Sequence, residues 1–103
     1  MDKARAEMLS EVLRNLANPT RLRLVVLLAQ GGERTVGDLA RALDLTQAAT
    51  SQGLAALRLG GLVRVRREGG FRYYDLAVPD LATLVGCLTG CGRAQARLAA
   101  GSD

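Results

Sequence analysis

Apolar residues recur along most of the chain at the three- and four-residue spacing of amphipathic helices, and the pattern changes to alternation after residue 60. A first stripe predicts a helix near the N-terminus and consists of Leu9, Val12, Leu13 and Leu16. The Asn18-Pro19 pair interrupts this helix, because asparagine can cap a helix and proline suits the first helical position. Apart from Arg23, residues 22 to 28 are apolar and cover most of the circumference of a helix, so we expect a second helix that lies in the core.

The centre of the chain predicts two short helices joined by a tight turn. Thr35 is a suitable N-cap with Asp38 three residues later, as in a capping box, and apolar positions follow at helical spacing to about residue 43. Thr46 is a second N-cap candidate, and it opens a helix that Gly60-Gly61 can end. The pattern is typical of a helix-turn-helix over about residues 35–60.

The alternating segment LVRVRR follows directly, and FRYYDL resumes the extended pattern after the turn-forming residues Glu68-Gly69-Gly70. These segments predict a β-hairpin, or wing, over about residues 62–76. Pro79 and an apolar stripe after it predict a C-terminal amphipathic helix over about residues 79–92. The expected fold is therefore mainly α with a β-hairpin wing: a winged helix-turn-helix of about five helices and two strands, in a single domain spanning residues 1–103.

Charge location indicates what the helix-turn-helix and the wing contact. The chain has fourteen Lys and Arg against ten Asp and Glu, a net charge of +4, and residues 58 to 72 alone carry five arginines and one glutamate. A charge run by itself is usually a solvated face, but a basic hairpin directly behind a helix-turn-helix favours contact with DNA phosphates. Short and amide side chains early in the second helix of the helix-turn-helix, the one that Thr46 opens, suit base edges. The predicted DNA-binding residues are Thr46, Gln47, Thr50, Ser51, Gln52, Arg58, Arg64, Arg66, Arg67 and Arg72.

Residues 10 to 88 resemble the ArsR/SmtB family of winged-helix transcriptional repressors. Three features occur in the order typical of the family: the Asn18-Pro19-Thr20-Arg21 start of the helix before the helix-turn-helix, the register of the recognition helix, and the wing. The resemblance implies a cytoplasmic homodimer that binds a double-stranded operator with imperfect two-fold symmetry and releases it when an inducer binds. Many members carry Ser-Arg-His-Leu where this chain has Ser51-Gln52-Gly53-Leu54, so a basic contact and an imidazole are missing. The alternative function is a protein-interaction or dimerisation module without inducer-controlled specific DNA binding.

The resemblance also implies that the C-terminal helix packs against its counterpart in a dimer. The predicted interface consists of Leu9, Val12, Leu13, Leu81, Leu84, Val85 and Leu88. The alternative is that the C-terminal stripe covers the core of its own monomer.

Cys87 and Cys91 lie four residues apart on the predicted C-terminal helix, so both thiols flank one side of the leucine stripe. Such a pair can chelate a soft metal or metalloid ion, or it can respond to oxidants or reactive sulfur. The third possibility is that both cysteines are small buried hydrophobes. Two thiols without any histidine are incomplete for structural zinc. The family's thiolate site at the start of the helix-turn-helix is replaced here by Glu33-Arg34-Thr35-Val36-Gly37. Of the family's histidine and carboxylate site on the terminal helix, this chain retains at most Asp80. A zinc, nickel or cobalt sensor of that type is therefore not expected.

Enzymes and membrane proteins do not fit this composition. The chain has no histidine, no glycine-rich phosphate loop and no nucleophile motif, and the cysteine spacing is not the Cys-x-x-Cys of thiol oxidoreductases. It also lacks an apolar run approaching about 20 residues and a signal-peptide pattern. We therefore expect a cytoplasmic protein that is not an enzyme and has no membrane partner.

Overall fold

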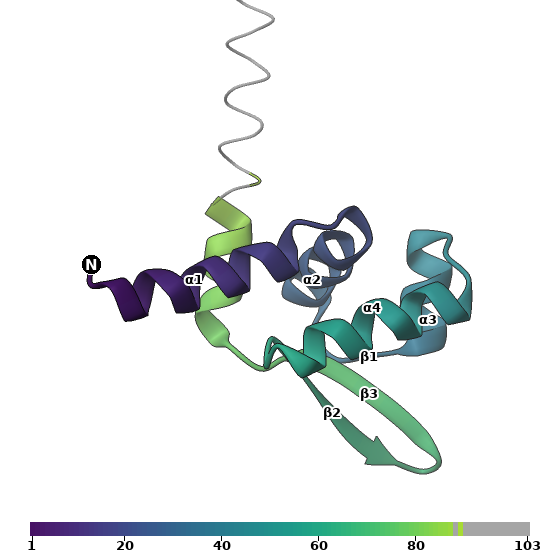
Figure 1. The fold of residues 1–103 in the computed structure, drawn as a ribbon. Coiled ribbons are helices and arrows are strands. Elements are labelled where there is room, and N and C mark those ends of the chain that lie inside the picture. Colours follow the sequence, from purple (N-terminus) through teal and green to yellow (C-terminus); the bar gives the residue numbers. More distant parts are fainter. Residues whose placement is uncertain (88, 90–103) are drawn as a thin grey trace, which may run out of the picture.

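Helices form the body of the protein and a β-hairpin projects from it, as the computed structural model shows (Figure 1). The structure describes residues 1–87 and residue 89. Its elements are α1 (Lys3–Leu16), α2 (Pro19–Gly31), β1 (Arg34–Thr35), α3 (Val36–Leu43), α4 (Gln47–Leu59), β2 (Val63–Glu68) and β3 (Phe71–Leu76). A fifth helix covers residues 79–87. None of the helices in the described part of the chain is long and apolar enough to cross a membrane.

Side-chain caps begin the helices where the sequence predicts them. The Asn18 side chain accepts a hydrogen bond from the Arg21 amide at 3.0 Å, which opens α2. The Thr35 and Thr46 hydroxyls open α3 and α4 in the same way, through amides three residues later at 3.1 and 3.0 Å. Asp44 ends α3 in the left-handed conformation, with φ of 54°, and this makes the turn between the two helices short. The predicted helix-turn-helix is thus confirmed.

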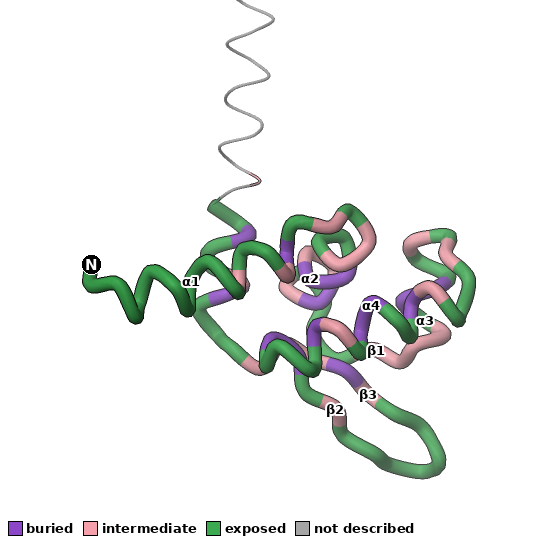
Figure 2. The backbone as a smooth tube through the Cα atoms, in the orientation of Figure 1, coloured by how far each residue is buried: buried purple, intermediate pink, exposed green. Residues whose placement is uncertain are grey.

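The core lies where α2, α3 and α4 meet the base of the hairpin, and the buried backbone is concentrated there (Figure 2). Apolar side chains with at most 1% exposure come from all three helices: Leu24, Val25, Leu28, Leu39, Leu54 and Leu57. The prediction that α2 is a core helix is confirmed for its inward face, whereas Leu22 is 40% exposed. Burying apolar surface is the main favourable contribution to folding, so α2 holds α3 and α4 in place.

A three-stranded antiparallel sheet in the order β1-β3-β2 replaces the predicted two-stranded hairpin. The predicted hairpin itself is confirmed, and Gly69 and Gly70 turn it with positive φ values of 57° and 81°. The additional strand, β1, pairs Arg34 with Tyr74 and Thr35 with Tyr73. A strand of two residues shows no alternation of apolar and polar positions, which explains why the sequence pattern missed it.

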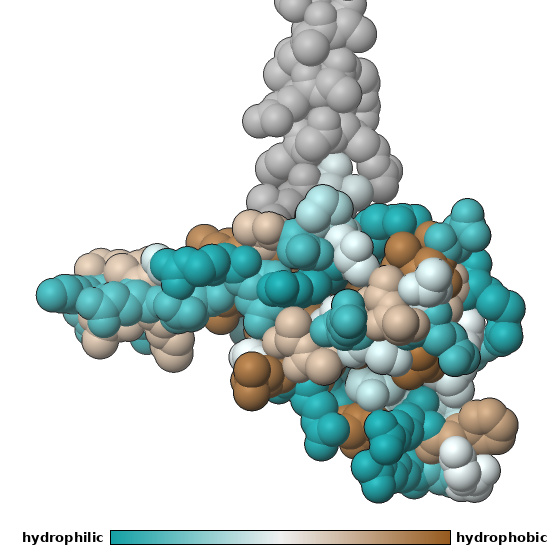
Figure 3. Space-filling model, turned by 45° about the vertical axis from the view of Figure 1, so that its right-hand side comes forward, coloured by the Kyte–Doolittle hydropathy of each residue, from teal (hydrophilic) through white to brown (hydrophobic). Residues whose placement is uncertain are grey.

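The residues predicted to form a dimer interface differ in how far they are buried. Leu81 and Val85 are each 4% exposed and belong to the monomer's own core, so the structure favours the alternative role for these two. Leu9, Leu13 and Leu84 remain 41, 54 and 39% exposed. Val12 is partly buried, and Leu88 lies outside the described residues, as does the end of the C-terminal helix predicted near residue 92. In Figure 3, α1 projects from the body and carries apolar side chains between hydrophilic ones.

Candidate nucleic-acid interface

The solvent-facing side of α4 carries most of the predicted base-contacting residues. Gln47 and Ser51 are exposed and lie one helical turn apart, and Arg58 is exposed two turns further along. Gln52, the next residue after Ser51, is exposed, and so is Thr46, whose hydroxyl caps the helix. Gln47, Ser51 and Arg58 therefore lie along one side of α4, where an incoming duplex can reach them. Gln52 lies about 100° round the helix from Ser51 and lines a separate pocket with Thr20 and Arg21.

Thr50 does not belong to this surface, and its predicted contact with DNA is wrong. The residue has an exposed fraction of 0% and lies on the inward side of α4. Its hydroxyl donates a hydrogen bond to the Thr46 carbonyl oxygen at 2.8 Å, which satisfies the only polar group of a buried side chain. Helical spacing would have placed Thr50 with Leu54 and Leu57, because residues four and seven apart share a face.

Gly53 also faces inward, so it does not replace a base contact. A Cβ atom at this position would lie 2.8 Å from Cδ1 of Leu24 and 3.6 Å from Cγ2 of Thr20. The missing side chain therefore lets α4 approach α2 closely. The difference from the Ser-Arg-His-Leu pattern changes the packing at residue 53, and it changes the exposed surface at Gln52.

The strand register sorts the wing side chains onto two faces, because directly opposite residues of an antiparallel pair point to the same side. One face, here called the inner face, carries the pairs Val63 with Leu76, Val65 with Tyr74 and Arg67 with Arg72. The other, the outer face, carries Arg64 with Asp75, Arg66 with Tyr73 and Glu68 with Phe71. Val63 and Tyr74 are buried, so the inner face is the one that packs on the helices.

Arg66 on the outer face has close acidic partners. Its Nε and Nη2 atoms donate to the two carboxylate oxygens of Glu33 at 3.0 and 3.1 Å, and Nη1 donates to Glu68. The guanidinium also lies 4.8 Å from the centre of the Tyr73 ring. The hydrogen bond from Arg66 lowers the pKa of Glu33, and the same contact raises the pKa of Arg66. The guanidinium of Arg66 is therefore already paired with carboxylates of the protein itself.

Arg64 shares the outer face and has a looser acidic partner. Its Nη2 atom lies 3.7 Å from Oδ2 of Asp75, which is the residue opposite it on β3. Both outer-face arginines are thus at least partly neutralised. An exposed ion pair of this kind is weak and can open, but it lowers the gain from a phosphate contact.

Arg67 and Arg72 on the inner face differ, because they lie directly opposite each other. Among residues 1–87 and 89, neither forms a salt bridge. Like charges at opposite positions of a strand pair destabilise the pair, and a phosphate between them would relieve the repulsion. The wing thus offers two free guanidinium groups on the face that it shares with the helices.

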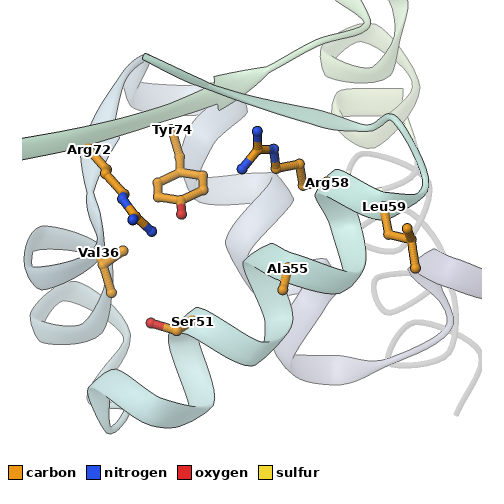
Figure 4. Close-up of a pocket in the computed structure, with 7 residues that line it drawn as sticks. All are labelled: Val36, Ser51, Ala55, Arg58, Leu59, Arg72 and Tyr74. Carbon is orange, nitrogen blue, oxygen red and sulfur yellow. The ribbon is translucent and has the colours of Figure 1, made fainter. Parts of the chain in front are cut away.

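A cleft of about 620 Å³ separates α4 from the wing. Its lining residues are Val36, Ser51, Ala55, Arg58, Leu59, Arg72 and Tyr74. Figure 4 shows Arg58 and Arg72 on either side of the Tyr74 ring, with Ser51 across the cleft on α4. The cleft therefore joins the exposed side of α4 to Arg72 of the inner face, and Arg67 lies opposite Arg72 on the neighbouring strand.

The three-dimensional charge distribution differs from the count along the sequence. Residues 58 to 72 contain five arginines and one glutamate, but the fold adds Glu33 and Asp75 to the outer face. The positive charge is consequently concentrated on the α4 side, at Arg58, Arg67 and Arg72. Sequence counting missed this because Glu33 is 33 positions away from Arg66.

Of the two predicted inducer residues, the structure describes Cys87. This cysteine is exposed and free, which contradicts the possibility that it is a buried hydrophobe within the monomer. Cys91 lies outside the described residues. In the described part of the chain, no group of three or more His, Cys, Asp or Glu side chains is arranged to hold a metal ion.

The sequence is similar to those of known bacterial regulatory proteins. The sequence profile of the family described as "Bacterial regulatory protein, arsR family" matches residues 18–65. A biofilm growth-associated repressor of Agrobacterium fabrum is 43% identical over 84 residues, which are 82% of this chain and 71% of that protein. An HTH-type transcriptional regulator of Mycobacterium tuberculosis is 45% identical over 83 residues, or 78% of this chain, but the match spans just 36% of that longer protein.

Solved structures show the same arrangement of helices and wing. The transcriptional repressor BigR from Xylella fastidiosa superposes with a TM-score of 0.80 and 35% identity, over 86% of this chain and 90% of that chain. A homodimeric winged helix-turn-helix DNA-binding domain from Mycobacterium bovis gives a TM-score of 0.78 and 36% identity, over 90% of this chain and 88% of that one. The chain therefore has the winged helix-turn-helix fold, and the family profile covers α2, the helix-turn-helix and the first residues of β2.

Proposed function

This chain belongs to the ArsR family of bacterial regulatory proteins, and from that premise we propose that it is a homodimeric DNA-binding transcriptional regulator that acts as a repressor. The observation that carries the proposal is the common cleft. The exposed side of α4 and Arg72 of the inner face border the same space, and Arg67 lies opposite Arg72, so one duplex can contact the helix and both arginines. A helix of this kind fits the major groove, and the wing reaches the adjacent backbone.

Each part of the surface has a separate task in this proposal. Gln47, Ser51 and Gln52 contact base edges or phosphates from the exposed side of α4, because amide and hydroxyl groups can donate and accept hydrogen bonds there. Arg67 and Arg72 neutralise the backbone between the recognition helix and the wing. The protein acts in the cytoplasm, where it meets the operator.

A second copy of the chain supplies the other half of the operator contact. In a homodimeric helix-turn-helix protein the two recognition helices read half-sites about one helical turn apart, which requires an operator with two-fold symmetry. The exposed apolar side chains Leu9, Leu13 and Leu84 supply the surface for the partner. The homodimeric Mycobacterium bovis domain supports this assembly.

Salt-dependent binding tests the proposal. The duplex is selected from a random-sequence pool, and the affinity of the protein for it is measured by fluorescence anisotropy at several salt concentrations. Each lost phosphate contact is expected to reduce the slope of log affinity against log salt by about 0.9. We expect Arg67→Ala and Arg72→Ala each to reduce the slope, while Arg64→Ala, whose side chain faces Asp75, is the matched control and changes it less. If the protein binds no duplex more tightly than bulk DNA, the interaction-module alternative replaces this proposal.

For the inducer we propose a thiol-reactive compound or a soft metal or metalloid ion that acts at Cys87 and Cys91. The exposure of the Cys87 thiol supports this, because such a thiol is accessible to either reagent. Operator binding by the reduced protein is measured alone and with arsenite, cadmium, peroxide or a persulfide donor. We expect Cys87→Ser and Cys91→Ser each to abolish release while leaving operator affinity intact. Normal release from the double variant would show that the thiols are not the sensor.

A further inference from the structure

The Arg66 contacts join parts of the chain that are far apart in sequence. Glu33 lies between α2 and β1, whereas Arg66 lies in the middle of β2. The pairing is bidentate, with N–O distances of 3.0 and 3.1 Å, and this geometry fixes the orientation of the guanidinium as well as its position. The outer face of the wing is thereby attached to the segment that leaves the core helix α2.

The position of this contact along the hairpin is mechanically important. Arg66 lies opposite Tyr73, and Tyr73 is the last residue of β3 toward the wing tip that pairs with β1. Beyond this point the hairpin has two strands and its residues are exposed (Figure 2). An isolated two-stranded ribbon is marginally stable in water, so an additional attachment where the third strand ends limits the movement of the tip.

The same contacts make Arg66 a poor ligand for DNA. Its Nε, Nη1 and Nη2 atoms all donate to carboxylates, and the guanidinium is stacked over Tyr73. A phosphate that approached Arg66 would also approach Glu33 and Glu68, and like charges repel. Arg67 and Arg72 on the opposite face have no such neighbours among the salt bridges of the described residues.

We propose that Arg66 is a positioning residue, which holds the wing against the segment between α2 and β1 through Glu33 and does not itself bind DNA phosphate. This inference rests on the proposed function, since the wing that it positions carries the phosphate-binding arginines. It assigns Glu33 a part in DNA binding although Glu33 carries the same charge as DNA.

Two readouts test this role, DNA affinity as a function of salt and amide hydrogen exchange of β2 and β3 in the free protein. We expect Arg66→Ala to weaken binding by roughly three- to tenfold at every salt concentration, because the wing is less ordered, with an unchanged slope. Arg66→Lys is expected to behave in the same way, since a lysine keeps the charge but cannot form the bidentate pair. In both variants the hairpin amides should exchange faster. Arg72→Ala is the comparator, with a reduced slope.

The charge-swapped variant E33R/R66E keeps the net charge and restores the ion pair between positions 33 and 66, but it places a glutamate beside Glu68 and removes the contact with Tyr73. We therefore expect it to recover part of the affinity and part of the slow exchange lost in Arg66→Ala. An Arg66→Ala slope reduced as much as that of Arg72→Ala would overturn the proposal, and so would wild-type affinity and exchange in Arg66→Lys. Affinity and exchange in a folded charge-swapped protein that are no closer to wild type than those of Arg66→Ala would also overturn it. If the wild-type chain binds no specific duplex, the proposed function fails, and unchanged hydrogen exchange in Arg66→Ala would still refute the positioning role by itself.

Discussion

Replacing Gly53 with alanine is expected to destabilise the domain, although alanine is the better helix former. In a helix interior, alanine is favoured over glycine by about 1 kcal/mol. The added Cβ would lie 2.8 Å from Cδ1 of Leu24, and Leu24 has an exposed fraction of 0%, so its methyl group can move only by disturbing the surrounding core. Overpacking costs about 1–3 kcal/mol. The expected net loss is therefore about 0–2 kcal/mol in the free energy of unfolding.

Urea denaturation at one fixed protein concentration measures this effect, and a double-mutant cycle with Leu24→Ala isolates it. Leu24→Ala alone should cost about 2–5 kcal/mol. In the double variant the alanine at position 53 has space, so the two effects should fail to add by about 1 kcal/mol or more. Gly86→Ala is the matched control, because a Cβ there meets nothing within 4 Å and its helix should be stabilised. Additive effects, together with a Gly53→Ala protein more stable than wild type, would refute the close approach of α4 to α2.

Three further predictions concern the surface of α4, the dimer and the wing. Thr50→Val should leave DNA affinity unchanged and cost about 0.5–1.5 kcal/mol of stability through the lost hydrogen bond, whereas Ser51→Ala should weaken DNA binding. A large loss of DNA affinity in a folded Thr50→Val protein would contradict the inward orientation of Thr50. Leu13→Glu should give a monomer in sedimentation velocity, because it places a charge on an exposed apolar position of α1, and a dimer that persists would exclude this position from the interface. Arg66 holds the pKa of Glu33 below its ordinary value of 4.5, so their contact is present above that pH and is lost as the pH falls through the lowered pKa. The Arg66 Nε–H signal in NMR spectra should therefore shift below pH 4.5, and a shift confined to higher pH would disprove the pairing.

The sequence alone predicted the elements whose signals are local. Caps act within three residues, so Thr35 and Thr46 marked the starts of α3 and α4 without any knowledge of the fold. Positive φ values favour glycine, so Gly69-Gly70 marked the turn of the wing. The order of these elements, together with the resemblance that it carries, was sufficient to predict a winged helix-turn-helix that binds DNA.

Only the tertiary structure decided which side chains are exposed on the surface of α4 and the wing that we propose to contact DNA. Thr50 and Gly53 lie within the recognition helix, but packing against α2 turns both inward. Arg66 and Arg67 have the same charge and lie next to each other on β2, yet Arg66 pairs with Glu33 and Arg67 forms no salt bridge within the described part of the chain. The physical reason is the range of the interactions: caps and turns join residues a few positions apart, whereas close packing and ion pairing join residues that the chain brings together only when it folds.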